Sequence, residues 1–157
     1  MSMYQSEEDT KNEMRIADAL ALELGVSVLM TPKGSSVDYI MHKDGAIVGI
    51  GECKARRGEY SYERMLEFGD VMLDASKVKS ARMISKSLMV NFYFVVELTN
   101  RMLYFECDWR DDLKLKTKKI RLGKVRDLND EDVVALFPIS QFKVMQNDPE
   151  TIPARRP

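Results

Sequence analysis

The chain has 157 residues, of which 45% are hydrophobic and 31% are charged, and its formal net charge is −1. This composition is typical of a globular domain with a packed core, and it argues against a disordered chain or a polycation. Two cysteines and one histidine exclude a disulfide-rich scaffold, a four-cysteine iron–sulfur cluster and a His-rich zinc site.

The first third of the chain predicts a helix followed by strands. Residues 10–24 carry apolar side chains at helical spacing, with Thr10 as the N-cap and Gly25 after the last turn. Apolar and β-branched residues predict three strands, at residues 26–30, 37–41 and 46–53. The turn between the last two contains Asp44-Gly45, a pair typical of β-hairpins.

The remainder of the chain predicts further strands between helices. Residues 58–69 allow either a short helix or a polar loop. The later elements are a brief strand at 71–73, a helix from the cap Asp74 to about Leu88, a strand pair at 92–98 and 101–107, and a lysine-rich edge strand at 114–121. A last short helix is predicted from Asn129 or Asp130 to about Phe137, where Pro138 ends it.

This order, roughly α-β-β-β-(β)-α-β-β, predicts an α/β fold with a mixed central sheet flanked by helices. We expect a single domain over residues 1–147. The proline-rich residues 148–157 are expected to form a flexible C-terminal tail.

Three charged residues stand out at the ends of two predicted strands. Glu52 and Lys54 end an otherwise apolar strand and point to the same face, whereas Cys53 points to the opposite face and is expected in the core. The hairpin brings Asp38 back toward Glu52. Two carboxylates and a backbone carbonyl suit Mg²⁺ or Mn²⁺, and a lysine beside them can orient or deprotonate a water molecule. The pattern therefore favours metal-assisted hydrolysis of phosphodiester bonds.

The arrangement of Asp38 and Glu52-Cys53-Lys54 resembles the PD-(D/E)xK nuclease superfamily, which includes phage nucleases and Holliday-junction resolvases. Val37 stands where that family often has proline, and the resemblance covers about residues 10–107. It implies a restriction-endonuclease-like fold. It also implies that Asp38, Glu52 and Lys54 are catalytic and that the cofactor is Mg²⁺ or Mn²⁺.

The resemblance assigns further roles to individual residues. Asp38, Glu52 and the carbonyl of Cys53 would hold the metal, Lys54 would position the attacking water, and Glu13 would touch a second metal or a metal-bound water. The DNA phosphates would be contacted by Lys77, Arg56, Arg57 and Tyr60.

Plainer interpretations exist for several of these residues. Glu13 also fits a capping box with Thr10, and Lys77 fits a solvated helix position. Tyr60 also fits a packing role. Residues 114–126 contain seven Lys or Arg and no acidic residue, a run that suits a solubilising edge as well as a surface facing phosphates.

We expect a metal-dependent deoxyribonuclease, a structure-selective or non-specific endonuclease whose partner is DNA. The alternatives are a Holliday-junction resolvase, which requires a homodimer, and a catalytically inactive DNA-binding or assembly protein of the same fold. A protein–protein adaptor that uses the hairpin at 92–107 is a plainer alternative.

The sequence predicts no membrane partner. The N-terminus is polar and acidic, unlike a signal peptide, and the longest apolar run, Val133 to Ile139, is too short to span a bilayer. We therefore expect a cytoplasmic protein, in the host cytoplasm if a phage encodes it.

Overall fold

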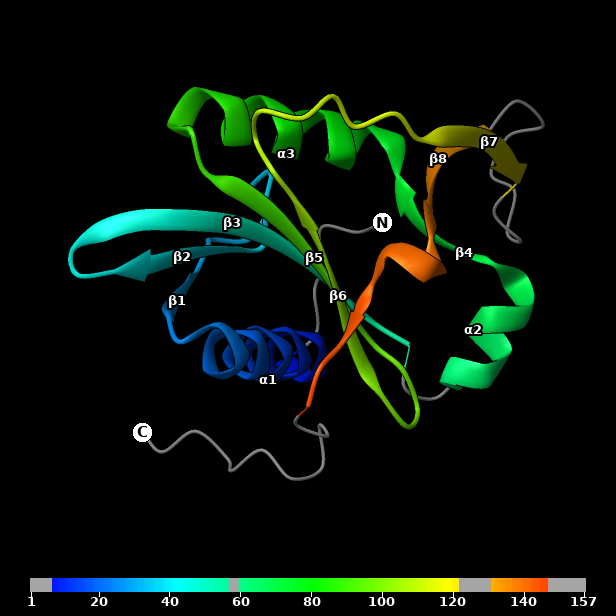
Figure 1. Ribbon diagram of the computed structural model, residues 1–157, viewed down its shortest axis with the longest axis horizontal. Helices are drawn as coiled ribbons and strands as arrows, with labels where there is room; N and C mark the ends of the chain where they lie inside the picture. Colours follow the sequence, from blue (N-terminus) through cyan, green and yellow to red (C-terminus); the bar gives the residue numbers. More distant parts are fainter. Residues whose placement is uncertain (1–6, 57–59, 122–130, 147–157) are drawn as a thin grey trace.

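The computed structural model describes residues 7–56, 60–121 and 131–146 (Figure 1). The elements in chain order are α1 (Glu7–Leu24), β1 (Ser27–Met30), β2 (Tyr39–Lys43), β3 (Ala46–Ala55), α2 (Tyr62–Phe68), β4 (Asp70–Asp74), α3 (Ala75–Leu88), β5 (Asn91–Glu97), β6 (Met102–Cys107), β7 (Lys116–Arg121), β8 (Glu131–Pro138), the 3-10 helix η1 (Ile139–Gln141) and β9 (Lys143–Val144). The α/β class with a mixed sheet flanked by helices, predicted from the sequence, is confirmed. The proposed tail at 148–157 lies outside the described residues.

Six strands form the main sheet, in the order β1-β2-β3-β5-β6-β9. β3 and β5 are parallel, and the other neighbours are antiparallel. Because a parallel pair needs a long crossover, the chain between β3 and β5 contains α2, β4 and α3. α1 lies against one face of this sheet and α3 against the other (Figure 1). The central strands are therefore covered on both faces, which explains why β3 is so apolar.

Each face of the main sheet has its own hydrophobic cluster. On the α1 side, Ile16, Leu20 and Tyr39 are fully buried. Tyr39 lies directly over Gly51 of β3, where a Cβ atom would overlap the tyrosine ring. On the α3 side, the Phe94 and Phe137 rings meet edge to face, with centroids 5.0 Å apart. The end of β3 therefore lies between two packed layers.

A second, three-stranded antiparallel sheet has the order β4-β8-β7. Here the prediction of a short helix ending near Phe137 is wrong, because these residues form β8. Val134 pairs with Asp74 of β4 on one side and with Lys118 of β7 on the other. β-branched residues favour strands, and pairing along both edges outweighs the capping signal. The proposed caps at 129 and 130 lie outside the described residues.

The lysine-rich strand β7 lies at the edge of the second sheet, as predicted. The ambiguous stretch at 58–69 contains helix α2, which Ser61 caps through a hydrogen bond from the Arg64 backbone N–H (3.1 Å). Within the described ranges, no helix has the length and apolar character needed to cross a membrane.

Candidate functional site

Asp38 immediately precedes β2, and three hydrogen bonds hold it against its neighbours. Its backbone N–H donates to the Gly51 carbonyl (2.9 Å), and its own carbonyl accepts from the Thr31 N–H (3.0 Å). Its side-chain Oδ2 accepts from the Cys53 backbone N–H (2.8 Å). Since these bonds reach the residues on either side of Glu52, the structure places the two carboxyl groups next to each other.

The Glu52 carboxyl is buried on the α3 side of the main sheet, with 2% of the residue exposed. Burial raises its pKa to about 9, and the negative charge of Asp38 and a hydrogen bond with that residue act in the same direction. The positive charge of Lys77 opposes this rise. The buried Glu52 carboxyl beside the half-buried Asp38 therefore needs either a proton or a cation to balance its charge.

Lys54 lies two residues beyond Glu52 and points to the same face of β3. Partial burial lowers its pKa to about 8, and the positive charges of Arg56 and Lys77 lower it further. Asp74 and Glu52 oppose this shift. A lysine with this pKa can take up or release a proton near neutral pH.

The start of α3 contributes two charged residues to the site. Asp74 caps this helix by accepting from the Ser76 backbone N–H (2.8 Å), and hydrogen bonding from Ser76 lowers its pKa. Lys77 follows in the first turn, where its charge acts on both Glu52 and Lys54. From the sequence, Lys77 was predicted to contact DNA, whereas Asp74 was predicted only as a helix cap. The approach of α3 to β3 depends on the long connection between β3 and β5, which has no local sequence signal.

Cys53 and Glu13 lie on the α1 side of β3. The Cys53 thiol donates to the Glu13 carbonyl (3.7 Å), and burial raises the pKa of this thiol. The Glu13 charge also contributes to the raised pKa of Glu52. Within the part of the chain that the structure describes, however, no three His, Cys, Asp or Glu side chains are grouped to hold a metal ion. Glu13 therefore does not join Asp38 and Glu52 in a three-residue cluster.

A divalent cation fits the donor atoms at the end of β3. Asp38 and Glu52 offer hard carboxylate oxygens, the ligands that Mg²⁺ and Mn²⁺ prefer. Burial and the neighbouring Asp38 charge both raise the pKa of Glu52, so its ionised form is disfavoured without a cation beside it. A bound cation would supply positive charge and favour the ionised form of both carboxyl groups.

An ion pair that was not predicted from the sequence connects α1 to the main sheet near the end of β3. Glu97, the last residue of β5, has a 1% exposed side chain and forms a bidentate pair with Arg15, with Nη2–Oε1 at 2.6 Å. The Glu97 carbonyl also accepts from the Arg56 N–H (2.7 Å). The pair joins residues 82 positions apart in sequence, so no local pattern could reveal it.

Of the other predicted DNA contacts, Arg56 and Tyr60 lie just beyond Lys54, and Arg57 lies outside the described residues. The Tyr60 N–H donates to the Arg56 carbonyl (3.1 Å). Its ring packs edge to face against Phe68, with centroids 5.4 Å apart. Tyr60 therefore has a packing role, whatever else it contacts.

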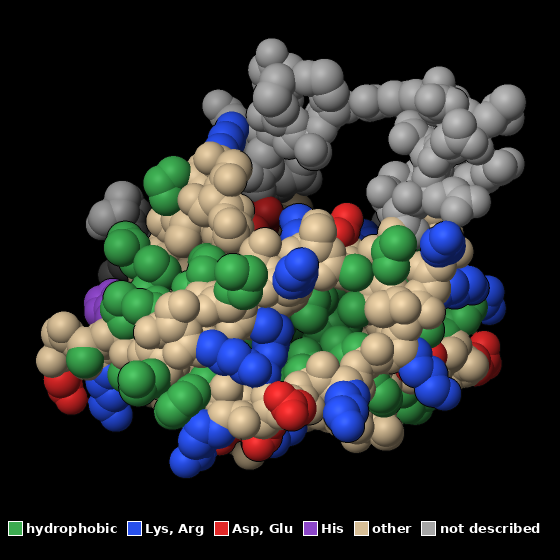
Figure 2. All heavy atoms as spheres, turned by 90° about the horizontal axis from the view of Figure 1, so that it is seen from above, with side chains coloured by type: hydrophobic (Ala, Val, Ile, Leu, Met, Phe, Trp, Pro, Cys, Tyr) green, Lys and Arg blue, Asp and Glu red, His purple; other side chains and the backbone are tan. Residues whose placement is uncertain are grey.

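The upper face of the molecule is rich in positive charge. Helix α3 carries no acidic residue, and its basic residues are Lys77, Lys79, Arg82 and Lys86. Strand β7 is KTKKIR, again without an acidic residue. Basic side chains predominate over acidic ones across the centre of this face (Figure 2). Arg82 is engaged within the fold, since its Nη1 donates to the Cys107 Sγ (3.0 Å).

The buried Glu52 carboxyl predicts a pH-dependent stability for the metal-free protein. Its folded-state pKa of about 9 lies above the ordinary 4.5, so between these values the folded protein keeps a proton that the unfolded chain releases. The stability that the bound proton contributes is complete below the pKa of Glu52 in the unfolded chain. It is lost as pH rises toward the pKa of Glu52 in the folded protein. In urea denaturation with EDTA, stability should therefore fall as pH rises through this window.

Glu52→Gln should remove this decline, whereas Glu67→Gln, at an exposed position on α2, should retain it. If the wild type and Glu52→Gln lose stability in parallel over this pH range, the proposed burial of a protonated Glu52 is wrong.

Comparison with known proteins identifies a family for this chain and solved structures of similar fold. Residues 1–145 match the family described as "Phage putative PDDEXK endonuclease". No curated protein matches the sequence. Among solved structures, the fold is similar to Hjc, a Holliday junction resolvase of the archaeal hyperthermophile Archaeoglobus fulgidus, with 13% sequence identity and a TM-score of 0.44. That match covers 79% of this chain and 84% of the other.

Proposed function

The chain belongs to the PDDEXK family of phage endonucleases, and from this premise we propose that it hydrolyses DNA phosphodiester bonds with Mg²⁺ or Mn²⁺. The observation that carries this proposal is the hydrogen bond from the Cys53 N–H to the Asp38 carboxylate (2.8 Å). This bond holds Asp38 beside Glu52, and Glu52 and Lys54 both lie on β3. Two carboxylates can hold a divalent cation, and a nearby lysine can move a proton or stabilise charge on a phosphate, so this set suits metal-assisted phosphodiester hydrolysis.

Asp38, Glu52 and the Cys53 carbonyl would hold the cation, which polarises a phosphate oxygen and makes water a better nucleophile when bound. Lys54 has a pKa of about 8. In its neutral form it can accept a proton from the attacking water, and in its charged form it stabilises negative charge on the phosphate. Lys77, exposed on α3, would contact the scissile phosphate. A role for Glu13 toward a second metal or a metal-bound water remains part of the proposal.

The basic residues of α3 and β7 would bind the DNA backbone around the site. Contacts between basic side chains and phosphates position the protein on DNA but carry no direct sequence information. We therefore favour structure-selective or sequence-independent cleavage. A protein encoded by a phage would act in the cytoplasm of its host.

The test is incubation of the protein with supercoiled, linear, single-stranded, flapped and four-way DNA, with Mg²⁺, Mn²⁺ or EDTA. Cleavage that needs a divalent cation supports the proposal. DNA binding without cleavage under every condition would contradict it and would favour an inactive DNA-binding protein of the same fold. Paired cuts in four-way DNA by a protein that light scattering shows to be a dimer would favour a resolvase.

A further inference from the structure

A cavity of about 330 Å³ lies beside the end of β3, between α2, β5 and the second sheet, which β4, β8 and β7 form. The residues that matter for its chemistry are Arg56, Tyr60, Phe68, Met72, Val96 and Lys118. Its size falls in the range of small-molecule sites, where roughly 300 Å³ is the lower bound. The cavity is therefore large enough for a group such as a nucleotide base with its sugar.

The cavity borders the proposed reaction site. Val96 on its wall is the cross-strand partner of Lys54. Arg56 lies two residues beyond Lys54, a distance of about 7 Å along an extended chain. The charge of Arg56 acts directly on Lys54. A group in the cavity would thus lie next to a phosphate held at Lys54.

One wall of the cavity presents apolar side chains to solvent. Phe68 is 52% exposed and Met72 is 44% exposed. Tyr60 meets Phe68 edge to face, and the Arg64 guanidinium lies over the Phe68 ring, 5.3 Å from its centroid. Aromatic and arginine surfaces of this kind stack with nucleic-acid bases of any sequence.

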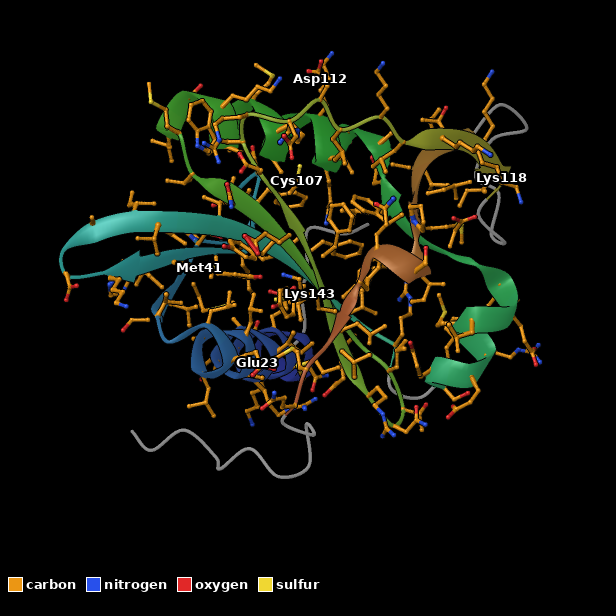
Figure 3. The ribbon with its side chains drawn as sticks, in the orientation of Figure 1. Glu23, Met41, Cys107, Asp112, Lys118 and Lys143 are labelled. Atoms are coloured by element: carbon orange, nitrogen blue, oxygen red, sulfur yellow. The ribbon has the colours of Figure 1, made fainter. Side chains whose placement is uncertain are left out.

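Charged side chains also line the cavity. Arg56 and Lys118 supply positive charge, and Asp70 supplies one carboxylate that can accept a hydrogen bond from an amino group of a base. Lys118 projects from β7 at the end of the molecule that carries α2 and β4, far from the labelled Glu23 and Met41 (Figure 3). An apolar wall flanked by cations matches a base attached to a phosphate.

We propose that this cavity binds one unpaired nucleotide of the DNA substrate, next to the phosphate that is cut. The base stacks against the wall formed by Tyr60, Phe68 and Met72, and the attached phosphate contacts Arg56 and Lys118. A base that is already unpaired costs least to bring into such a site, so bulges, flaps and single strands are the preferred substrates. This inference rests on the proposed nuclease function and specifies its substrate class.

The test compares three DNA duplexes in fluorescence anisotropy with EDTA, where no cutting occurs. One is fully paired, one has a single-nucleotide bulge, and one has the same bulge without its base. Wild-type protein should bind the nucleotide bulge about tenfold more tightly than the abasic bulge, the ratio expected for one stacked base. Phe68→Ala should bring this ratio close to one. Because Phe68 is half-exposed, the Phe68→Ala variant should fold as the wild type does, and circular dichroism checks this.

The neighbouring lysines of β7 provide a matched pair of variants. Lys118 lines the cavity, whereas the side chain of Lys119 points to the other face of the strand. Lys118→Ala should weaken binding of bulged DNA several-fold more than binding of paired DNA, because one phosphate contact is lost. Lys119→Ala removes the same charge and should affect both DNAs equally.

Two failures can be told apart. Equal wild-type affinity for the nucleotide bulge and the abasic bulge, in a protein that cuts DNA with Mg²⁺ or Mn²⁺, would overturn the cavity proposal alone. Absence of metal-dependent cutting of every DNA would overturn the nuclease proposal, whereas a retained tenfold ratio would still support a nucleotide site in the cavity.

Discussion

Lys54→Met should lower the rate of DNA cleavage by about a thousandfold or more and leave DNA affinity within a few-fold of wild type. Methionine keeps much of the half-buried stem in place but cannot move a proton or balance charge on a phosphate. Positioned proton transfer alone contributes about a hundredfold to ten-thousandfold to hydrolysis, and the lost positive charge adds to this effect. The measurement is a single-turnover cleavage rate, with affinity from anisotropy of the same DNA.

Lys79→Met is the matched control for this variant. Lys79 is exposed on α3 and lies two residues beyond Lys77, so the two side chains do not face each other. Because Lys79 would contact only the DNA backbone, the Lys79→Met variant should cut bound DNA at close to the wild-type single-turnover rate when the protein is saturating. If Lys54→Met also cuts at the wild-type rate, Lys54 has no catalytic role and the proposed mechanism is wrong.

Arg15→Met should lower the free energy of unfolding by about 3 kcal/mol, because it leaves the Glu97 carboxylate buried without its cation. The Glu97 side chain is 1% exposed, whereas that of Arg15 is 28% exposed. Glu97→Gln should therefore cost less than Arg15→Met, since an unpaired Arg15 can still reach water. Urea denaturation at neutral pH measures both. A smaller loss for Arg15→Met than for Glu97→Gln would contradict this account of the pair.

The link between this pair and the site is structural. Glu97 ends β5 beside Ala55, one residue beyond Lys54 on β3. The Arg15–Glu97 ion pair connects α1 to the end of β5, and the end of β5 pairs with the part of β3 next to Lys54. A partial loss of cleavage in Arg15→Met that follows its loss of stability would be the expected secondary effect.

The sequence predicted best those features that depend on residues close together in the chain. The apolar period of α1 and the Asp44-Gly45 turn are local signals, and both the helix and the hairpin formed. The predicted N-cap at Thr10 is wrong, because α1 already begins at Glu7 and Thr10 lies inside the helix. Counting back from the turn placed Asp38 near Glu52. The structure holds Asp38 against Gly51 and Cys53, even though the strand pairing shifts register between Met41 and His42.

The features that sequence reasoning missed depend on contacts between distant segments. β8 is a strand because β4 and β7 pair with it from both sides, and neither pairing has a local signal. The same is true of the Arg15–Glu97 pair and of the approach of Asp74 to Lys54. Long-range pairing can override local propensity, and here it did so at 131–138.

The position of β3 explains why its charged end has unusual chemistry. α1 and α3 cover opposite faces of the main sheet, so the buried middle part of β3 keeps Glu52 away from water (Figure 1). Burial is the largest cause of the shifted pKa values of both Glu52 and Lys54. The fold therefore places both residues on one face of β3 and shifts their pKa values in opposite directions.

Titration of Mn²⁺ into the protein, followed by isothermal calorimetry, tests most directly whether Asp38 and Glu52 form a metal site. The wild type and Asp44→Asn, a control at the exposed hairpin turn, should bind the ion with equal affinity. Asp38→Asn and Glu52→Gln should each lose at least about tenfold in affinity, because each removes a charged ligand. Equal Mn²⁺ affinity in all four proteins would show that the two carboxylates do not hold the cation.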